Sequence, residues 1–144
     1  MIDLAHGAED HPLAALFADR IRQNAAHDAA RGKAFRSLRA IVQFVPFETG
    51  EALTLRFDHG RLTVHEGSVG VPTVTVGGPL DVLLRLPDVE LQGIVPSLRG
   101  REERDFTVLR DLGRHLARRE LEVYGLFSHP RTVVRVLRLL ARPR

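Results

Sequence analysis

The chain contains no cysteine and no tryptophan among its 144 residues. Without cysteine it cannot form disulfides, use a thiolate nucleophile or build a zinc site that needs sulfur ligands. A domain of this length buries about 70% of the surface that its unfolded chain exposes, so it can fold without such a crosslink. The hydrophobic fraction of 44% and the charged fraction of 27% are typical of globular proteins. We therefore expect one globular domain over residues 1–144.

Long hydrophobic runs are also missing. The apolar runs are short, as at residues 40–42, and none approaches the ~18 residues that a membrane-spanning helix needs. The first eleven residues include Asp3, Glu9 and Asp10, and they lack the basic segment and apolar stretch of a secretory signal. We expect a cytoplasmic protein.

Lysine is almost absent, because 20 of the 21 basic residues are arginine. Residues 1–96 carry 9 basic and 12 acidic side chains, whereas residues 97–144 carry 12 basic and 6 acidic ones. An anionic partner would therefore meet the C-terminal third. Nucleic-acid binding is disfavoured, since single-strand binders interleave aromatic and basic residues and the only tyrosine here is Tyr124.

Motifs for catalysis, metals and cofactors are lacking as well. None of the seven histidines shows the paired spacing, with an intervening glutamate, of zinc hydrolases. No serine lies in a Gly-x-Ser-x-Gly motif; the nearest match, at 66–70, is offset by one residue. The Gly77-Gly78 turn has neither a Gly-x-Gly-x-x-Gly spacing nor a lysine for phosphate. We expect no enzyme activity, no metal and no cofactor.

The spacing of apolar residues predicts an α+β fold, with about five strands in a mainly antiparallel sheet that helices cover on one face. Strand 121–124 should belong to the same sheet as strand 53–57, because an isolated short strand is unstable. The expected elements, in chain order, are a helix over 12–31 ended by Gly32, strands over 40–47, 53–57, 62–64 and 72–76 with a hairpin turn at 58–60, a break at Gly77-Gly78-Pro79, a helix with Leu80, Leu83 and Leu84 on one side, a loop or short-helix lid over 87–100, a helix over 104–118, the strand over 121–124, and a helix from about 130 to 141.

The last predicted helix is the most informative element. Four arginines form one narrow stripe, namely Arg131, Arg135, Arg138 and Arg142, and six aliphatic residues, Val133, Val134, Val136, Leu137, Leu139 and Leu140, fill roughly 220° of the remaining arc. A surface helix needs an apolar stripe of only a little over ~100°. The surplus requires a second apolar neighbour, which is more core, another subunit or a ligand. The arginine stripe is either a solvated face or a contact for anionic lipid headgroups.

Three segments in this order resemble the sterol carrier protein type two family. Residues 53–64, LTLRFDHGRLTV, are similar to its hairpin, and residues 73–84, TVTVGGPLDVLL, to its strand and leucine-rich helix. Residues 116–140, LARRELEVYGLFSHPRTVVRVLRLL, are similar to its final strand, glycine and aliphatic helix. The resemblance covers residues 40–141, so residues 1–39 form an N-terminal helical extension. The segment 87–100 is longer than in the family, and residues 127–130 replace a more open polar turn.

The resemblance implies a five-stranded sheet and helices that enclose a hydrophobic tunnel for a sterol, fatty acyl chain or isoprenoid, with no catalytic residue. The implied ligand-binding residues are Leu83, Phe106, Leu126, Val133, Val134, Leu137, Leu139 and Leu140. Val134 and Leu139 lie on the two flanks of the apolar arc, and we expect one flank to line the cavity. Arg131, Arg135, Arg138 and Arg142 would contact anionic membranes transiently.

Bacterial stand-alone members also resemble accessory factors that hold ubiquinone precursors for partner enzymes. The main hypothesis is therefore a non-catalytic carrier of a hydrophobic ligand. A structural partner subunit that uses the apolar last helix as a protein interface is the first alternative, and a hydrolase or thioesterase is the second. A continuous cavity would favour the carrier, a filled core the subunit, and a buried Asp/His/Ser group the enzyme.

Overall fold

The computed structural model describes residues 1–86, 114, 117–118, 120–125 and 128–140, and it has an α+β fold. The elements, in chain order, are β1 (Ile2–Leu4), the 3-10 turn η1 (Ala8–Asp10), α1 (Ala14–His27), α2 (Ala29–Ser37), β2 (Arg39–Pro46), β3 (Leu53–Asp58), β4 (Leu62–Glu66), β5 (Val74–Gly78), α3 (Leu80–Leu84), β6 (Glu122–Tyr124) and α5 (Pro130–Leu140). The lid predicted at 87–100 and the helix predicted at 104–118 lie largely outside the described residues.

The strands form one mixed sheet of six strands in the order β1-β4-β3-β2-β5-β6. The β2-β3, β3-β4 and β5-β6 pairs are antiparallel, whereas β1-β4 and β2-β5 are parallel. The prediction of about five mainly antiparallel strands is therefore confirmed only in part, since three of the five pairs are antiparallel but the sheet is mixed and has a sixth strand. It missed β1 because three residues are too few to show an alternating pattern, and it missed the parallel β2-β5 pair because sequence spacing carries no strand direction.

The predicted strand at 121–124 and the predicted hairpin turn at 58–60 are both confirmed. Strand β6 pairs with β5 in the same sheet as β3. The turn between β3 and β4 is a two-residue hairpin loop, in which His59 and Gly60 have φ values of 47° and 91°. The Asp58 and Arg61 backbones bond each other in both directions, at 2.8 and 3.2 Å. These features match the type I′ turn that fits the twist of paired strands.

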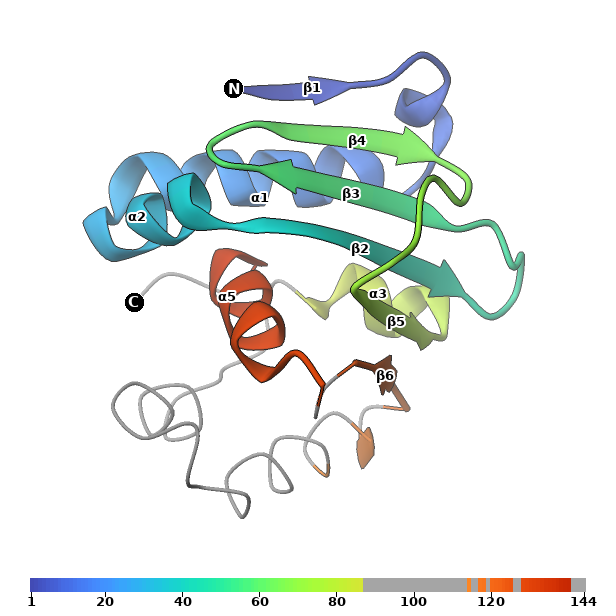
Figure 1. Ribbon diagram of the computed structural model, residues 1–144. Helices are drawn as coiled ribbons and strands as arrows, with labels where there is room; N and C mark the ends of the chain where they lie inside the picture. The colour runs from blue at the N-terminus through green and yellow to red at the C-terminus, as the bar shows by residue number, and fades with distance from the viewer. Residues whose placement is uncertain (87–113, 115–116, 119, 126–127, 141–144) are drawn as a thin grey trace.

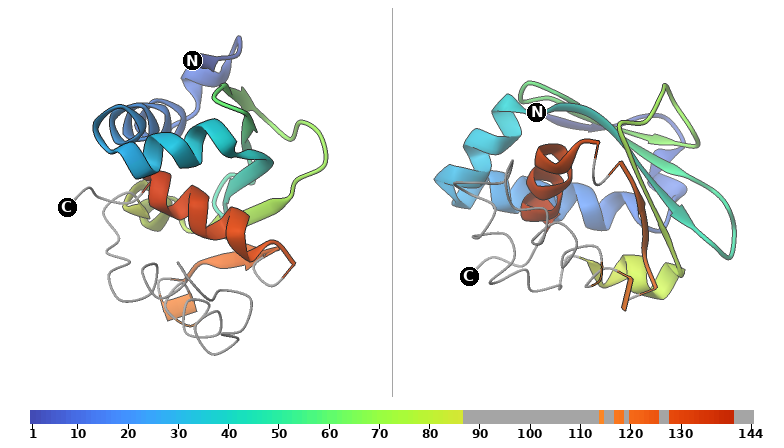
Figure 2. Two further views of the ribbon diagram at one scale, coloured as in Figure 1. Left: turned by 60° about the vertical axis from the view of Figure 1, so that its left-hand side comes forward. Right: turned by 60° about the horizontal axis from the view of Figure 1, so that its bottom comes forward.

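Helices α1, α2 and α5 lie on one face of the sheet, as predicted (Figures 1 and 2). The alternation of buried and exposed residues along the strands puts the apolar side chains on this face. Phe44 of β2 meets Phe17 of α1 edge to face at 4.7 Å between ring centroids, and Phe57 of β3 meets Phe35 of α2 at 6.3 Å. These contacts join the first two helices to the centre of the sheet.

The predicted helix over 12–31 is interrupted at Asp28, where the backbone is extended. The Asp28 carboxylate accepts hydrogen bonds from the Ala30 and Arg31 amides, at 2.9 and 3.2 Å, and so caps α2. Gly32 does not end the helix as predicted, since it lies inside α2. A Cβ at Gly32 would be 2.8 Å from the Ala25 carbonyl oxygen, so this glycine permits the close approach of α1 and α2.

The glycine pair after the fourth predicted strand does not break that strand. Gly77 and Gly78 are the last two residues of β5, and both are buried. A Cβ at Gly78 would meet the Leu121 side chain at 2.7 Å, and a Cβ at Gly77 would meet the Phe47 ring at 2.9 Å. These glycines therefore allow close packing of neighbouring side chains, whereas the turn propensity of glycine had predicted a break in the strand. Helix α3 begins after Pro79, as expected.

Candidate functional site

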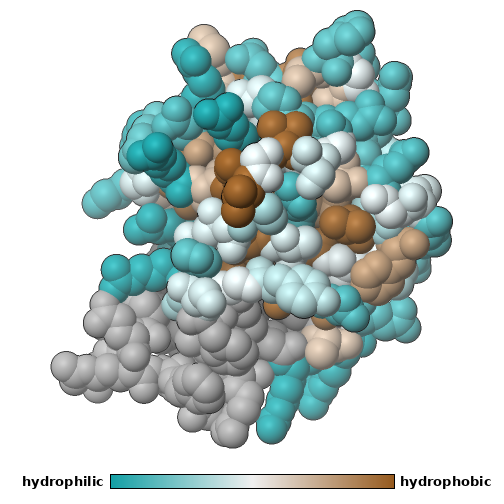
Figure 3. Space-filling view, turned by 45° about the vertical axis from the view of Figure 1, so that its right-hand side comes forward, coloured by the Kyte–Doolittle hydropathy of each residue, from teal (hydrophilic) through white to brown (hydrophobic). Residues whose placement is uncertain are grey.

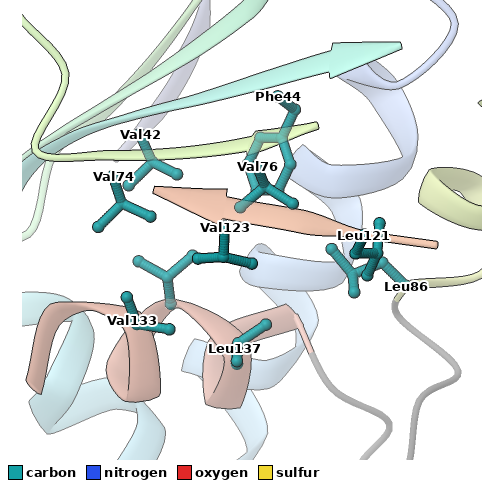
Figure 4. Close-up of a pocket in the computed structure, with 10 residues that line it drawn as sticks. Val42, Phe44, Val74, Val76, Leu86, Leu121, Val123, Val133 and Leu137 are labelled. Atoms are coloured by element: carbon teal, nitrogen blue, oxygen red, sulfur yellow. The ribbon is translucent and has the colours of Figure 1, made fainter. Parts of the chain in front are cut away.

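An apolar pocket lies between the sheet and α5 (Figure 4). Ten described side chains line it, and all are aliphatic or aromatic: Val42, Phe44, Val74, Val76, Leu86, Leu121, Val123, Val133, Val136 and Leu137. The strands β2, β5 and β6 form one wall and α5 forms the other, while Leu86 and Leu121 lie together at one end. The lining is therefore wholly apolar and offers no polar or titratable side chain.

Strand register and helix periodicity explain why these side chains meet. Val42 lies beside Val74, Phe44 beside Val76, and Val76 beside Val123 in neighbouring strands. Because alternate residues of a strand share one face, all five side chains point toward α5. On α5, positions 133, 136 and 137 follow the three- and four-residue spacing of one helix face. The pocket thus follows from the two-residue alternation of the strands and the three- and four-residue spacing of the helix.

The pocket is nearly closed. Its cavity volume is about 10 Å³, which is the room needed by a single water-sized sphere. Val42, Phe44 and Val133 are almost completely buried. An acyl or isoprenoid chain can enter only if α5 and the sheet move apart, or if the end formed by Leu86 and Leu121 opens.

The structure brings together only part of the predicted ligand-binding set. Val133 and Leu137 line the pocket. Leu83, Leu139 and Leu140 are buried and Val134 is half-buried, but none of these four is among the side chains that line this pocket. Phe106 and Leu126 lie outside the described residues. The pocket is lined by the middle of the apolar arc, so the expectation that a flank lines it does not hold for this pocket.

Eight lining residues were not in the predicted set: Val42, Phe44, Val74, Val76, Leu86, Leu121, Val123 and Val136. The alternation in β2, β5 and β6 was visible in the sequence, but it could not show that β5 lies between β2 and β6. That neighbourhood, which places Val76 between Phe44 and Val123, depends on the parallel β2-β5 pair.

The C-terminal end of α5 is fixed to the first two helices. The Asn24 side chain of α1, almost completely buried, donates a hydrogen bond of 2.6 Å to the Leu139 carbonyl oxygen. Arg31 of α2 donates in turn to the Asn24 side-chain oxygen at 3.2 Å. At the Leu139 end, α5 therefore packs against other parts of the same chain.

The arginine stripe of α5 is not uniformly exposed. Arg131 is exposed, whereas Arg135 and Arg138 are half-buried, and Arg142 lies outside the described residues. Arg138 is close enough to Asp28 to act on its carboxylate. The backbone hydrogen bond from Arg31 holds the pKa of Asp28 below its ordinary value, and the charges of Arg31 and Arg138 act in the same direction. Part of the stripe thus faces the junction of α1 and α2.

The described residues contain no cluster of side chains for metal binding. No group of three or more histidine, aspartate or glutamate side chains is placed to hold a metal in this part of the chain. His11 is buried, with Nε2 2.8 Å from the Glu51 carbonyl oxygen and Nδ1 accepting from the Leu13 amide at 3.2 Å. Both ring nitrogens are therefore used in fixing the start of α1. Over the same residues, no helix is long and apolar enough to span a membrane.

No protein-family model and no curated protein matches the chain. Solved structures do. A structure described as "UbiJ-SCP2 Ubiquinone synthesis protein" has a TM-score of 0.50 and 20% identity, and the match covers 85% of each chain. A structure described as "sterol carrier protein 2" has a TM-score of 0.49 and 15% identity, with 88% of this chain and 91% of that chain covered. The chain is thus similar in fold, over most of its length and at low sequence identity, to domains of the sterol carrier protein type two kind.

Proposed function

We propose that the chain binds or transfers a hydrophobic ligand, held between the sheet and α5, without catalysing a reaction on it. The observation that carries this proposal is the pocket, whose ten described lining side chains are all apolar. Ligand pockets are mostly apolar, with a few polar groups that fix orientation. A lining without polar groups suits a ligand portion that has none, such as a sterol, a fatty acyl chain or the tail of an isoprenoid or quinone precursor.

The cavity is too small for the proposed ligand unless α5 and the sheet move apart. A ligand must replace contacts between α5 and the sheet with contacts to itself, because about 10 Å³ does not hold an acyl chain. The two ends of α5 differ in this respect. Near its C-terminal end the helix is bonded to Asn24 through the Leu139 carbonyl, and the pocket-lining residues Val133, Val136 and Leu137 all precede Leu139 along the helix. We infer that the N-terminal end moves when a ligand enters.

One of the solved structures similar in fold is described as a ubiquinone synthesis protein. An isoprenoid or quinone precursor is therefore the ligand class that we propose to test first, together with a role as an accessory factor to partner enzymes. Arg131 and Arg135 are the described arginines that we propose for transient contact with anionic membranes. This contact would let the chain collect a ligand that resides in a bilayer.

The alternative of a structural subunit whose apolar α5 forms a protein interface has less support. Val133, Val136, Leu137, Leu139 and Leu140 are all buried within the chain itself. An interface along this side of α5 would first have to remove it from its own sheet.

Tryptophan substitutions on α5 test the proposal. Val133→Trp places an indole in the ligand's space, whereas Val134→Trp adds the same group on a flank that does not line the pocket. We expect Val133→Trp to weaken binding of fluorescent acyl and isoprenoid probes at least tenfold, and Val134→Trp to bind them as the unmodified chain does. A folded Val133→Trp variant with unchanged probe affinity would contradict the proposal.

A further inference from the structure

The sheet face opposite the helices, here called the outer face, carries an unusual set of side chains. Strand pairing places His65, Thr54, Gln43, Thr75 and Tyr124 in one row across β4, β3, β2, β5 and β6. Figure 3 shows the molecule from the side of this face, with apolar side chains among weakly polar ones in the middle and hydrophilic ones toward the edges.

One half of the outer face is raised. The connection from β4 to β5 crosses over β3 and β2, and we call its residues 67–73 the ridge. The Thr54 hydroxyl donates to the Gly67 carbonyl at 2.6 Å and accepts from the Val69 amide at 3.2 Å, and the Thr73 amide donates to the Ile41 carbonyl at 2.7 Å. Val71 stands on the ridge with 85% of its surface exposed.

The other half, over β5 and β6, has no such covering segment among the described residues. Tyr124 of β6 is 64% exposed there, and Phe47, whose ring lies over Gly77, is 52% exposed. The described residues include six exposed large hydrophobic side chains, and Val71, Phe47 and Tyr124 are three of them. All three lie on the outer face, which makes this face a candidate interaction surface.

Two exposed side chains of the outer face, one in each half, carry opposite charges. Arg56, on β3 beside the ridge, is exposed and pairs in register with Ile41. Glu122, on β6 in the open half, is exposed and pairs with Gly77, which in turn pairs with Val45. The two residues are therefore three strands and four residues apart, about 14 Å across the strands and about 13 Å along them. They lie on opposite sides of the Gln43-Thr75 pair.

We propose that the outer face binds a second copy of this chain in a two-fold symmetric dimer. A two-fold axis that passes diagonally over the Gln43-Thr75 pair sets the ridge of each copy on the open half of the other. It places Arg56 of each copy opposite Glu122 of the second copy, and Val71 against the exposed aromatic rings. The strands of the two sheets then cross near right angles, which is one of the two common ways in which sheets pack. Self-complementary shape and charge are the requirements of such an interface.

Charge reversal with mixing tests this geometry by sedimentation velocity over about 1–100 µM, the range in which a dimer of modest affinity dissociates. The unmodified chain should pass from monomer to dimer in this range. Arg56→Glu alone and Glu122→Arg alone each place like charges opposite one another twice, so we expect each variant to dimerise at least tenfold more weakly. An equimolar mixture of the two variants restores opposite charges at both contacts, and we expect it to form the mixed dimer.

Val71→Asp adds a further variant, matched by Gln23→Asp, which introduces the same charge at an exposed position of α1 on the other side of the sheet. Val71→Asp should remain monomeric at ~100 µM, while Gln23→Asp should dimerise as the unmodified chain does. Far-ultraviolet circular dichroism confirms that each variant is folded. A monomeric unmodified chain at ~100 µM, or a mixture that dimerises no better than its two components, would overturn the proposal.

Discussion

Leu137 and Leu139 offer a matched pair of substitutions that separates the pocket from the rest of the core. Both are leucines of α5 with 6% and 0% exposure, but only Leu137 lines the pocket. Truncation of a buried leucine to alanine costs about 2–5 kcal/mol of unfolding free energy, through lost burial and the cavity left behind. We expect Leu137→Ala and Leu139→Ala both to lose stability in this range when no ligand is present.

The two variants should differ once a hydrophobic ligand is added. At about 100 times its dissociation constant, a ligand stabilises the folded state by about 2.7 kcal/mol. In Leu137→Ala the ligand also fills the new cavity, so less of α5 has to move, and the ligand should bind more tightly than in the unmodified chain. Leu139 does not line the pocket, so the cavity left by Leu139→Ala should leave the ligand-induced gain unchanged.

Urea unfolding with and without an isoprenoid or acyl probe measures these gains. The account predicts that added probe recovers more of the lost stability in Leu137→Ala than in Leu139→Ala. Equal recovery in both variants, in the presence of a saturating probe, would refute the assignment of the ligand to the space between α5 and the sheet.

Three further predictions concern the surroundings of α5. Asn24→Ala leaves the buried Leu139 carbonyl without its donor, so it should lower the unfolding free energy by about 1–3 kcal/mol in urea titrations, whereas Gln23→Ala on the exposed side should change it little. The folded-state pKa of Asp28 lies below the ordinary value of 3.8, so its carboxylate adds stability that is present above this pH and lost as the pH falls through the folded pKa. Asp28→Asn, which keeps a capping side chain, should therefore be less stable than the unmodified chain at pH 7, and the difference should disappear in strong acid. Arg131→Glu with Arg135→Glu should reduce co-sedimentation with anionic vesicles at low salt and leave recovery on neutral vesicles unchanged.

The strands and the final helix could be predicted from the sequence because their signals are local. β2, β3 and α5 differ from the predicted ranges by one or two residues at most, since alternation in the strands and an amphipathic stripe in the helix are periodic over several residues. The hairpin turn was equally local, because positive φ angles at residues 59 and 60 favour the Asp-His-Gly sequence.

Glycine was the residue type that sequence reasoning misread. Gly32 and Gly78 were interpreted as stops because glycine commonly ends helices and strands. In the structure Gly32 lies inside α2 and Gly78 is the last residue of β5. Gly32 leaves room for the Ala25 carbonyl, and Gly78 leaves room for the Leu121 side chain. Such a neighbour is known only when the tertiary arrangement is known.

The pocket could be predicted only on its helix side. Val133 and Leu137 were visible because the apolar arc of α5 is wider than one interface needs. The opposite wall depends on which strand lies beside β2, and the parallel pairing of Val42 with Val74 has no signature in a single sequence. The wide arc also had three explanations, namely more core, another subunit or a ligand, and at Leu139 the backbone carbonyl is bonded to Asn24 of α1.

Methyl-resolved NMR during titration with an isoprenoid probe tests the central claim most directly. Val42, Val76 and Val133 line the pocket from three different elements, whereas Leu53 and Leu62 are buried in the same core and are not among the lining residues. The account predicts saturable shifts of the Val42, Val76 and Val133 methyl signals, with little change at Leu53 and Leu62. Shifts confined to other methyl groups, or no shifts with either isoprenoid or acyl probes, would contradict it.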